Sequence, residues 1–241
     1  MDFSDFQIRR CPATAIYIPN FITSGDEQRI LSHIERTPKP KWTQLLNRRL
    51  INYGGIPHPN GMLAEKIPDW LQVYVDKINN LNIFGTHNAN HVLVNEYLSG
   101  QGIMPHTDGP LFHPTISTIT CGSYTVLEFI DGRVNTLDHT ETGPQEETNN
   151  IESFQPESSP RETAFKILLE PRSLLILKDS LYRDYLHAIN EFKEDTLCDK
   201  ICNYENCETT HKMGDILKRG TRISLTIRHV PKTTKMKLKF C

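Results

Sequence analysis

The chain of 241 residues is 37% hydrophobic, which is enough to bury a full core and fits one large β-rich domain. Its formal net charge of −2 excludes a globally basic nucleic-acid binder, so any contact with nucleic acid must come from local basic patches. No apolar signal segment opens the chain, and no stretch approaches the roughly eighteen consecutive apolar residues of a membrane span. We therefore expect a soluble monomer of the cytoplasm and nucleus, with no membrane partner.

Two helices are predicted in the first third of the chain. The first runs from about Ser24 to Arg36, because Ser24 is followed three residues later by Glu27, a capping-box pattern, and apolar residues then recur at helical spacing. The second helix begins at Pro68, and its apolar face carries Leu71, Tyr74, Val75 and Ile78.

The segment between the two helices is rich in Gly, Pro and Asn and is predicted to be a loop. Within it, residues 42–61 hold side chains that can stack on bases or bind phosphates, namely Trp42, Arg48, Arg49, Tyr53 and His58. A structural loop anchored by its tryptophan explains the same residues equally well. Lysines before this loop and at the C-terminal end form two further basic runs of the kind that usually mark solvated surface: Lys39, Lys41, Lys232, Lys235, Lys237 and Lys239.

From residue 91 onward the sequence changes to short runs with a β pattern. They cover residues 91–97, 115–122, 124–130, 173–178 and 222–228. This order predicts a mainly β fold with flanking helices, in one domain over residues 1–241. The segment 131–163 is polar and acidic and has almost no aliphatic side chain to bury, so we predict a flexible insertion between two strands.

The last of these runs, RISLTIR, alternates strictly between polar and aliphatic residues. Successive side chains of a strand point to opposite faces, so one face carries Arg222, Ser224, Thr226 and Arg228. Water is the ordinary partner of such a face in a half-exposed strand, and a bound ligand is the alternative. In the run HVLVNEY the same alternation places Asn95 and Tyr97 together on one face.

Three residues are candidates for a metal site. His106 and Asp108 form an H-x-D pair in GIMPHTDGP, and His187 follows the apolar strand SLLILK. Each of these patterns is weak when taken alone. Together, two histidines and one carboxylate are the ligand set of non-haem Fe(II) oxygenases. Arginines bind carboxylates bidentately, so a small dianion such as 2-oxoglutarate, chelating the metal at one end and reaching an arginine at the other, would join these elements.

The cysteines give a separate hypothesis. Six irregularly spaced cysteines without a secretory signal are most simply reduced thiols. Cys198, Cys202, Cys207 and His211 lie close in sequence and offer a ligand count that zinc could use. Their spacing is not the C-x-x-C of a zinc knuckle, so a loop with incidental thiols is the alternative that we favour.

The order N-x-Y, H-x-D, a distant His and R-x-S-x-T-x-R resembles the AlkB-like Fe(II)/2-oxoglutarate dioxygenases. The resemblance extends over most of the chain and includes PKPKWTQL, PHPNGM, LNIFG, ANHVLVNEYL, GIMPHTDGP and LLEPRSLLILK. It implies a double-stranded β-helix, or jelly roll, supported by the two N-terminal helices. It also implies oxidation of a substrate with Fe(II), 2-oxoglutarate and molecular oxygen.

The resemblance further implies a role for each candidate residue. The Fe(II) ligands would be His106, Asp108 and His187. Arg222, supported by Tyr97 and Ser224, would hold the distal carboxylate of 2-oxoglutarate. The residues near the metal-bound end of the co-substrate, or lining the same face, would be Asn95, Arg228 and Thr226.

The resemblance points to a nucleic-acid substrate, because AlkB-like enzymes that act on alkylated bases hold a flipped nucleotide under a lid, here residues 42–61. Pro110 stands where the bacterial family member has an acidic residue that reads the base, so we do not expect efficient repair of 1-methyladenine or 3-methylcytosine. Two alternatives stay open. One is a dioxygenase acting on protein side chains, and the other is a nucleic-acid-binding module with vestigial turnover.

Overall fold

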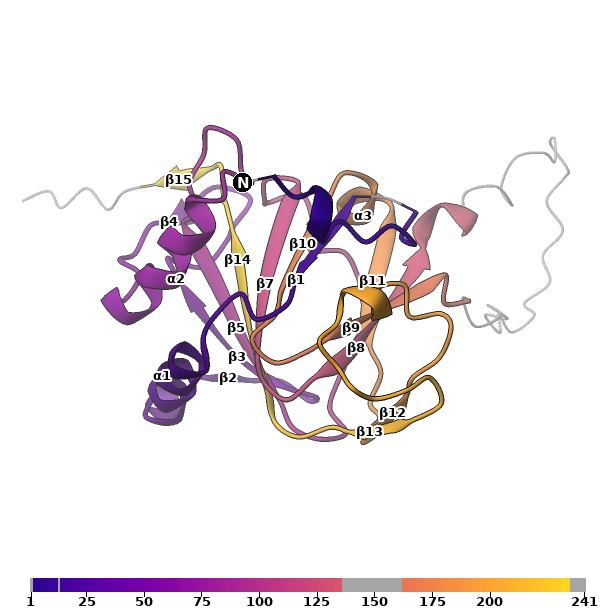
Figure 1. The fold of residues 1–241 in the computed structure, drawn as a ribbon. Coiled ribbons are helices and arrows are strands. Elements are labelled where there is room, and N and C mark those ends of the chain that lie inside the picture. Colours follow the sequence, from indigo (N-terminus) through magenta and orange to yellow (C-terminus); the bar gives the residue numbers. More distant parts are fainter. Residues whose placement is uncertain (1, 13, 136–161, 235–241) are drawn as a thin grey trace, which may run out of the picture.

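The fold is a double-stranded β-helix in which two antiparallel sheets pack face to face. The structure is a computed structural model that describes residues 2–12, 14–135 and 162–234. Figure 1 shows three layers, with the helices α1 and α2 on the left, the larger sheet in the middle and the smaller sheet on the right. The two inner faces meet in a core that includes Tyr97, Leu175, Phe129 and Ile167.

The larger sheet has seven strands in the order β1-β10-β7-β14-β5-β3-β2. Listed in that order, the strands span Ala15–Ile18, Leu174–Lys178, Thr115–Gly122, Arg222–Arg228, His91–Tyr97, Arg49–Tyr53 and Thr43–Gln44. The strand β14 pairs with both β5 and β7. The strand β14 is therefore at the centre of the sheet, where each of its faces meets other protein.

The smaller sheet has four strands in the order β6-β11-β8-β9. These span Ile103–His106, Tyr185–Ile189, Thr125–Asp131 and Phe165–Leu169. Two short pairs complete the β structure: β12 with β13, spanning Glu194–Thr196 and Ile216–Lys218, and β4 with β15, spanning Met62–Leu63 and Thr233–Thr234.

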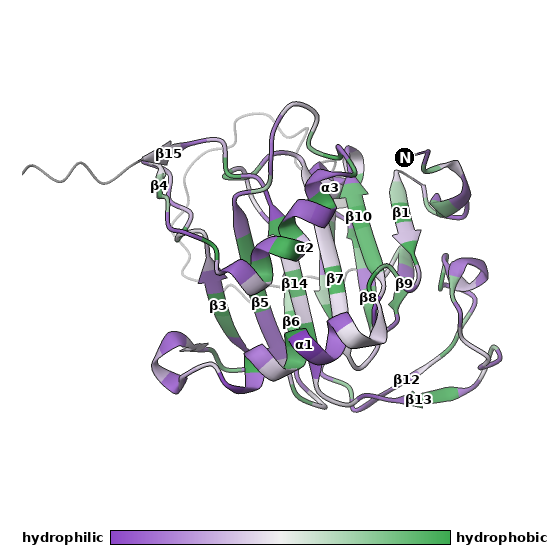
Figure 2. Cartoon of the chain, turned by 60° about the vertical axis from the view of Figure 1, so that its left-hand side comes forward, coloured by the Kyte–Doolittle hydropathy of each residue, from purple (hydrophilic) through white to green (hydrophobic). Residues whose placement is uncertain are grey.

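Two helices cover the outer face of the larger sheet, and in Figure 2 they lie in front of β5, β14 and β7. They are α1, Ser24–Glu35, and α2, Asp69–Asn79. A short third helix, α3, spans Ser180–Arg183, and single 3-10 turns cover Ser4–Phe6, Lys39–Lys41, Gly132–Asn135 and Tyr204–Asn206. The four apolar residues predicted on the inner face of α2 are all buried, and each contributes about 1.5–3 kcal/mol by leaving water.

Both predicted helices are confirmed, but the cap of the first was assigned one residue too late. Thr23 is the N-cap residue, and its partner three positions on is Asp26, whose carboxylate accepts from the Thr23 backbone N–H. The carboxylate of Glu27 instead accepts from the backbone of Gly122 and from Arg172. Glu27 thus ties the helix to the rest of the fold rather than capping it.

The loop predicted between the helices is partly wrong, because it contains the hairpin β2–β3. The β3 strand pairs along β5, with Ile51 opposite Val94 in the buried part of the sheet. The Gly- and Pro-rich composition on either side obscured this strand. The predicted acidic insertion lies mostly in residues 136–161, outside the described part of the chain. Its flanking strands, β8 and β9, pair with each other as a hairpin.

The five predicted strands are confirmed to within one residue at each end. The hypothesis that RISLTIR exposes one face to water is wrong, since all seven residues of β14 are buried. Its aliphatic residues Ile223, Leu225 and Ile227 pack in the core beneath α1 and α2. Its polar residues face the space between the two sheets.

Candidate active site

A cavity of about 230 Å³ lies between the two sheets. It is lined by all nine residues that the sequence singled out: Asn95, Tyr97, His106, Asp108, His187, Arg222, Ser224, Thr226 and Arg228. Strand register explains why they meet. Across the β5–β14 pair, Arg222 lies opposite Tyr97 and Ser224 opposite Asn95, while His187 lies opposite His106 across the β11–β6 pair. The structure therefore brings together residues from distant parts of the sequence, from Asn95 to Arg228.

The two histidines and the aspartate form one end of the cavity. The imidazole rings of His106 and His187 have their centroids 4.3 Å apart, and His187 Nε2 lies 3.7 Å from Asp108 Oδ2. Nδ1 of His106 is 2.8 Å from the carbonyl oxygen of Met104. This hydrogen bond requires the proton on Nδ1 and leaves the Nε2 lone pair available, as in histidines that bind metals.

The protonation of His187 also suits a metal ligand. Burial lowers the pKa of His187 to about 4, a shift that the nearby Asp108 carboxylate only partly opposes, so its ring is neutral at neutral pH. Among the described residues, no group of three His, Cys, Asp or Glu side chains is already arranged so that it could hold a metal ion. Arg228 Nη1 donates to Asp108 Oδ1 at 2.5 Å. The donor set nevertheless fits an Fe(II) ion, with two imidazoles and one carboxylate at one end of a cavity.

A buried arginine without a carboxylate partner forms the other end. Arg222 is 4% exposed, its Nη2 donates to Thr120 Oγ1 at 3.0 Å, and its buried Nε has no acceptor. Burial lowers the pKa of Arg222 to about 10, which still leaves the guanidinium charged at neutral pH. A buried charge that lacks a partner costs several kcal/mol, so this group needs an anion. The distal carboxylate of 2-oxoglutarate has the charge and the paired oxygens to fill that need.

The loop that carries Asp108 is held by residues that the sequence analysis missed. The hydroxyl of Tyr182, on α3, donates to the carbonyl oxygens of Gly109 and Phe112, the latter at 3.2 Å. The Phe112 ring in turn lies under the guanidinium of Arg228, 3.8 Å from Cζ to the ring centroid. Tyr182 and Phe112 thus fix the loop and the arginine on either side of Asp108. No periodic pattern marks these two residues, so only the fold reveals them.

A third arginine also lines the cavity. Arg48 lies immediately before β3, and its Nε donates to Asn95 Oδ1 at 3.2 Å. The sequence predicts a lid that holds Arg48 together with four other residues, but in the structure these side chains make different contacts. The ring of Trp42 lies 4.1 Å from the guanidinium of Arg49, and Tyr53 packs edge-on against Trp70. These aromatic rings anchor the hairpin to the core, as the alternative interpretation of this segment proposed.

A family model described as the 2OG-Fe(II) oxygenase superfamily matches residues 31–228. The chain belongs to this superfamily. It is therefore an Fe(II)- and 2-oxoglutarate-dependent dioxygenase, as the motifs predicted. A Danio rerio protein named "Probable RNA/DNA demethylase ALKBH6" is 45% identical over 238 residues, which cover 99% of this chain and 94% of that protein. This match confirms the resemblance to the AlkB-like dioxygenases that the motifs indicate.

More distant relatives share less sequence. An Arabidopsis thaliana protein named "Alkylated DNA repair protein ALKBH8 homolog" is 25% identical over 88% of this chain and 57% of its own length. Among solved structures, OsALKBH1 has a TM-score of 0.53 at 16% identity, over 89% of this chain and 96% of that chain. A 2OG-Fe(II) oxygenase family oxidoreductase from Burkholderia pseudomallei has a TM-score of 0.51 at 9% identity, over 97% and 95%. The two structural likenesses confirm the double-stranded β-helix.

The residues considered for zinc make separate contacts in this dioxygenase. Cys202 lies beside Cys11, Cys207 contacts the backbone of Asn203, and His211 lies 3.7 Å from a carboxylate oxygen of Asp215. Over the described ranges they do not gather into a metal-binding group. Whether this segment binds zinc or is a loop with incidental thiols stays a prediction.

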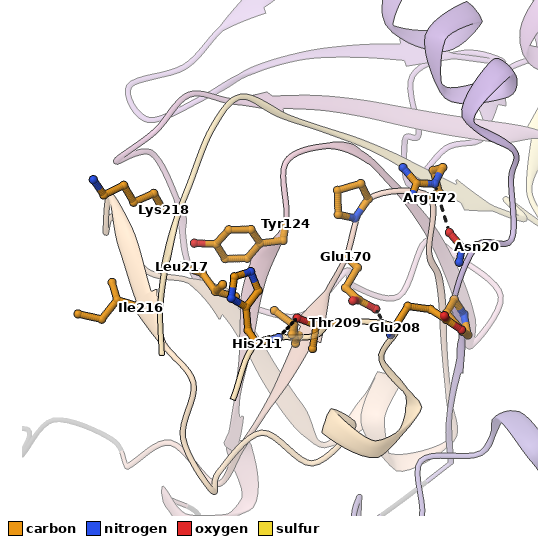
Figure 3. A pocket seen from close by; sticks show the side chains of 13 residues that line it. Asn20, Tyr124, Glu170, Arg172, Glu208, Thr209, His211, Ile216, Leu217 and Lys218 are labelled. Carbon is orange, nitrogen blue, oxygen red and sulfur yellow. Dashed lines mark hydrogen bonds between the residues drawn. The ribbon is translucent and has the colours of Figure 1, made fainter. Parts of the chain in front are cut away.

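A second cavity, of about 410 Å³, is larger than the first but contains none of the nine predicted residues. Figure 3 shows its lining, with Glu170 near the centre and Tyr124 and His211 to one side. The carboxylate of Glu170 accepts from the Tyr17 hydroxyl at 2.9 Å and from the Glu208 backbone at 3.0 Å. The carboxylate of Glu170 is thus already hydrogen-bonded within the protein.

The described helices are all too short or too polar to cross a membrane.

Proposed function

We propose that this dioxygenase oxidises a nucleic-acid substrate in the cavity between its two sheets, with His106, Asp108 and His187 holding Fe(II). One observation carries the proposal: a single cavity has a His/Asp/His set at one end and the buried Arg222 at the other. Among the described residues, the Nε of Arg222 has no hydrogen-bond acceptor. The 45% identical zebrafish protein, whose name describes an RNA/DNA demethylase, supports the choice of nucleic acid. The cytoplasmic and nuclear location and the monomeric state stay predictions.

The chemistry follows from the groups that the cavity would bind. Fe(II) with 2-oxoglutarate and molecular oxygen supplies the oxidation of a substrate C–H bond, coupled to decarboxylation of 2-oxoglutarate to succinate and carbon dioxide. On an N-methyl group, hydroxylation is followed by loss of formaldehyde, which leaves the bare nitrogen. Whether the net result is hydroxylation or demethylation therefore depends on the substrate.

The protein's own residues bind, orient and exclude water. Arg222 receives the distal carboxylate of the co-substrate, with the Tyr97 ring 5.7 Å from its guanidinium carbon and Ser224 next along the face. The Met104 carbonyl fixes the tautomer and orientation of His106, and Arg228 orients Asp108. Apolar side chains from both sheets keep the cavity dry: Leu127, Leu169, Leu175 and Leu177.

The test is to measure succinate and formaldehyde released by the protein supplied with Fe(II), 2-oxoglutarate and oxygen. The reactions contain an N-methylated single-stranded oligonucleotide, its unmethylated counterpart, or an N-methylated peptide. We expect the methylated oligonucleotide alone to stimulate succinate release, with an equal amount of formaldehyde. Asp108→Asn, which keeps an acceptor for Arg228 but weakens the metal site, should abolish both products.

Two other outcomes would contradict the proposal. Stimulation by the peptide and not by the oligonucleotide would identify a protein-modifying dioxygenase, which the absence of a base-reading acid at Pro110 permits. Tight binding of the oligonucleotide without any stimulation of succinate release would identify a binding module.

A further inference from the structure

Arg48, immediately before β3, and Arg49, the first residue of β3, face opposite sides of the sheet. Side chains alternate along a strand, so Arg48 points into the cavity while Arg49 points away from it. The guanidinium of Arg49 makes two hydrogen bonds to Glu96, at 2.6 and 2.7 Å, and stacks on Trp42. Its charge is therefore neutralised and its donors are engaged.

Arg48 is in a different state. Its Nε donates to the neutral Asn95 side chain, and within the described chain no carboxylate lies at ion-pair distance from it. Unlike the fully buried Arg222 and Arg228, it is only partly buried, so it lies on the side of the cavity that solvent reaches. The two Nη groups of an arginine form a fork that matches the paired oxygens of a phosphate.

The charges of the cavity lining leave Arg48 without a counter-ion. Three guanidinium groups line the cavity and Asp108 is the carboxylate among the described lining residues. Arg228 pairs with Asp108, and Arg222 has the position to take the distal carboxylate of the co-substrate. The formal charges of Fe(II) and the 2-oxoglutarate dianion cancel, so binding both leaves the excess positive charge of the lining in place.

We propose that Arg48 binds a phosphate of the nucleic-acid substrate at the entrance to the cavity. This inference rests on the proposed nucleic-acid substrate and names the residue that holds its backbone. Arg48 also links the two ligands, because the side chain that it contacts, Asn95, lies on the strand that faces the co-substrate. Its position differs from that of Lys39, Lys41 and Lys232, which do not line the cavity.

The experiment measures binding of a labelled, N-methylated single-stranded oligonucleotide by fluorescence anisotropy over a range of salt concentrations, with Mn(II) and 2-oxoglutarate present. We expect Arg48→Met to weaken binding about tenfold at low salt. It should also reduce the slope of log Kd against log salt by about 0.7, the value for one phosphate contact on a single strand. Arg48→Lys should keep most of the slope and lose affinity, because it keeps the charge without the fork.

The matched control is the double variant Arg49→Met, Glu96→Gln, which removes the neighbouring arginine together with its carboxylate partner. Its salt slope should equal that of the unmodified protein. An unchanged slope in Arg48→Met would overturn the inference while leaving the proposed function intact. Calorimetric titration of 2-oxoglutarate alone gives a second check: if Arg48→Met weakens this binding as much as oligonucleotide binding, the residue holds the co-substrate instead. Failure of the unmodified protein to bind any oligonucleotide would overturn the nucleic-acid substrate itself.

Discussion

Replacing Arg222 should reduce the stabilisation that 2-oxoglutarate gives to the fold, without reducing the stability of the fold itself. Without the co-substrate, its guanidinium is a buried charge with no carboxylate partner, held by one hydrogen bond to Thr120. Substitution by an apolar residue of similar length removes that unfavourable burial. Even complete buried ion pairs can often be replaced by apolar residues with no loss, or with a gain of about 1–4 kcal/mol. We therefore expect Arg222→Met to unfold at the same or a higher temperature than the unmodified protein when both lack 2-oxoglutarate.

With 2-oxoglutarate the unmodified protein should gain more stability than Arg222→Met gains. At one hundred times its Kd, a ligand that binds only the folded state stabilises it by about 2.7 kcal/mol. Loss of a bidentate, charge-assisted contact costs about 1.5–3 kcal/mol, which raises Kd at least tenfold. At the same concentration the stabilisation then falls to about 1.4 kcal/mol or less. Arg222→Lys, which keeps the charge but not the fork, should also raise the Michaelis constant for 2-oxoglutarate at least tenfold, or about 1.4 kcal/mol.

The assay is thermal unfolding with Mn(II), at several concentrations of 2-oxoglutarate, with succinate as a control dicarboxylate. An equal temperature shift in the unmodified protein and in Arg222→Met would refute the reasoning, since the distal carboxylate would then bind elsewhere. A large loss of stability in Arg222→Met without 2-oxoglutarate would show that the guanidinium has a structural partner within the protein.

Three further predictions follow from the site and its surroundings. Tyr182→Phe should weaken Mn(II) binding several-fold, because it releases the loop that carries Asp108. The control Tyr204→Phe removes a hydroxyl bonded to a distant loop carbonyl and should leave Mn(II) binding unchanged. Equal Mn(II) affinities in titrations of the two variants would argue against this role of Tyr182. The metal-free protein should lose stability as pH falls from about 6.5. Burial lowers the pKa of His91 to about 3, so the unfolded chain takes up a proton that the folded protein does not, at a cost of about 1.4 kcal/mol per pH unit. Urea unfolding of His91→Gln should show a shallower pH dependence of stability, and an unchanged dependence would contradict the assignment. Deletion of residues 136–160 should change Tm little because the segment has almost no apolar side chain to bury, and a Tm loss of many degrees would show that it packs on the core.

The inner face of the fold was predictable where short periodic patterns carried the information. The alternation in RISLTIR and HVLVNEY placed Arg222 and Asn95 on cavity-facing sides, and both strands occur at the predicted residues. The same pattern could not distinguish a cavity wall from a solvated face, because a polar side chain in alternation looks alike in both cases. That distinction depends on the second sheet, which is brought over the first by long-range packing.

The residues that sequence reasoning missed act through contacts between distant segments. Tyr182 contacts Gly109 and Phe112, which are about seventy residues earlier in the chain, and no local pattern encodes such a contact. The different roles of Arg48 and Arg49 depend on which face of β3 each occupies, and the Gly- and Pro-rich surroundings hid that strand. The buried His91, which bonds to Asn52 across the β3–β5 pair, was overlooked for the same reason.

The proposed site is one cavity that binds the metal at one end and the distal carboxylate of the co-substrate at the other. The most direct measurement is a crystal structure of the protein with Mn(II) and 2-oxoglutarate. We predict the metal among His106, Asp108 and His187, with the distal carboxylate bound bidentately by Arg222. A metal held by other residues, or a 2-oxoglutarate molecule whose distal carboxylate lies away from Arg222, would contradict the account.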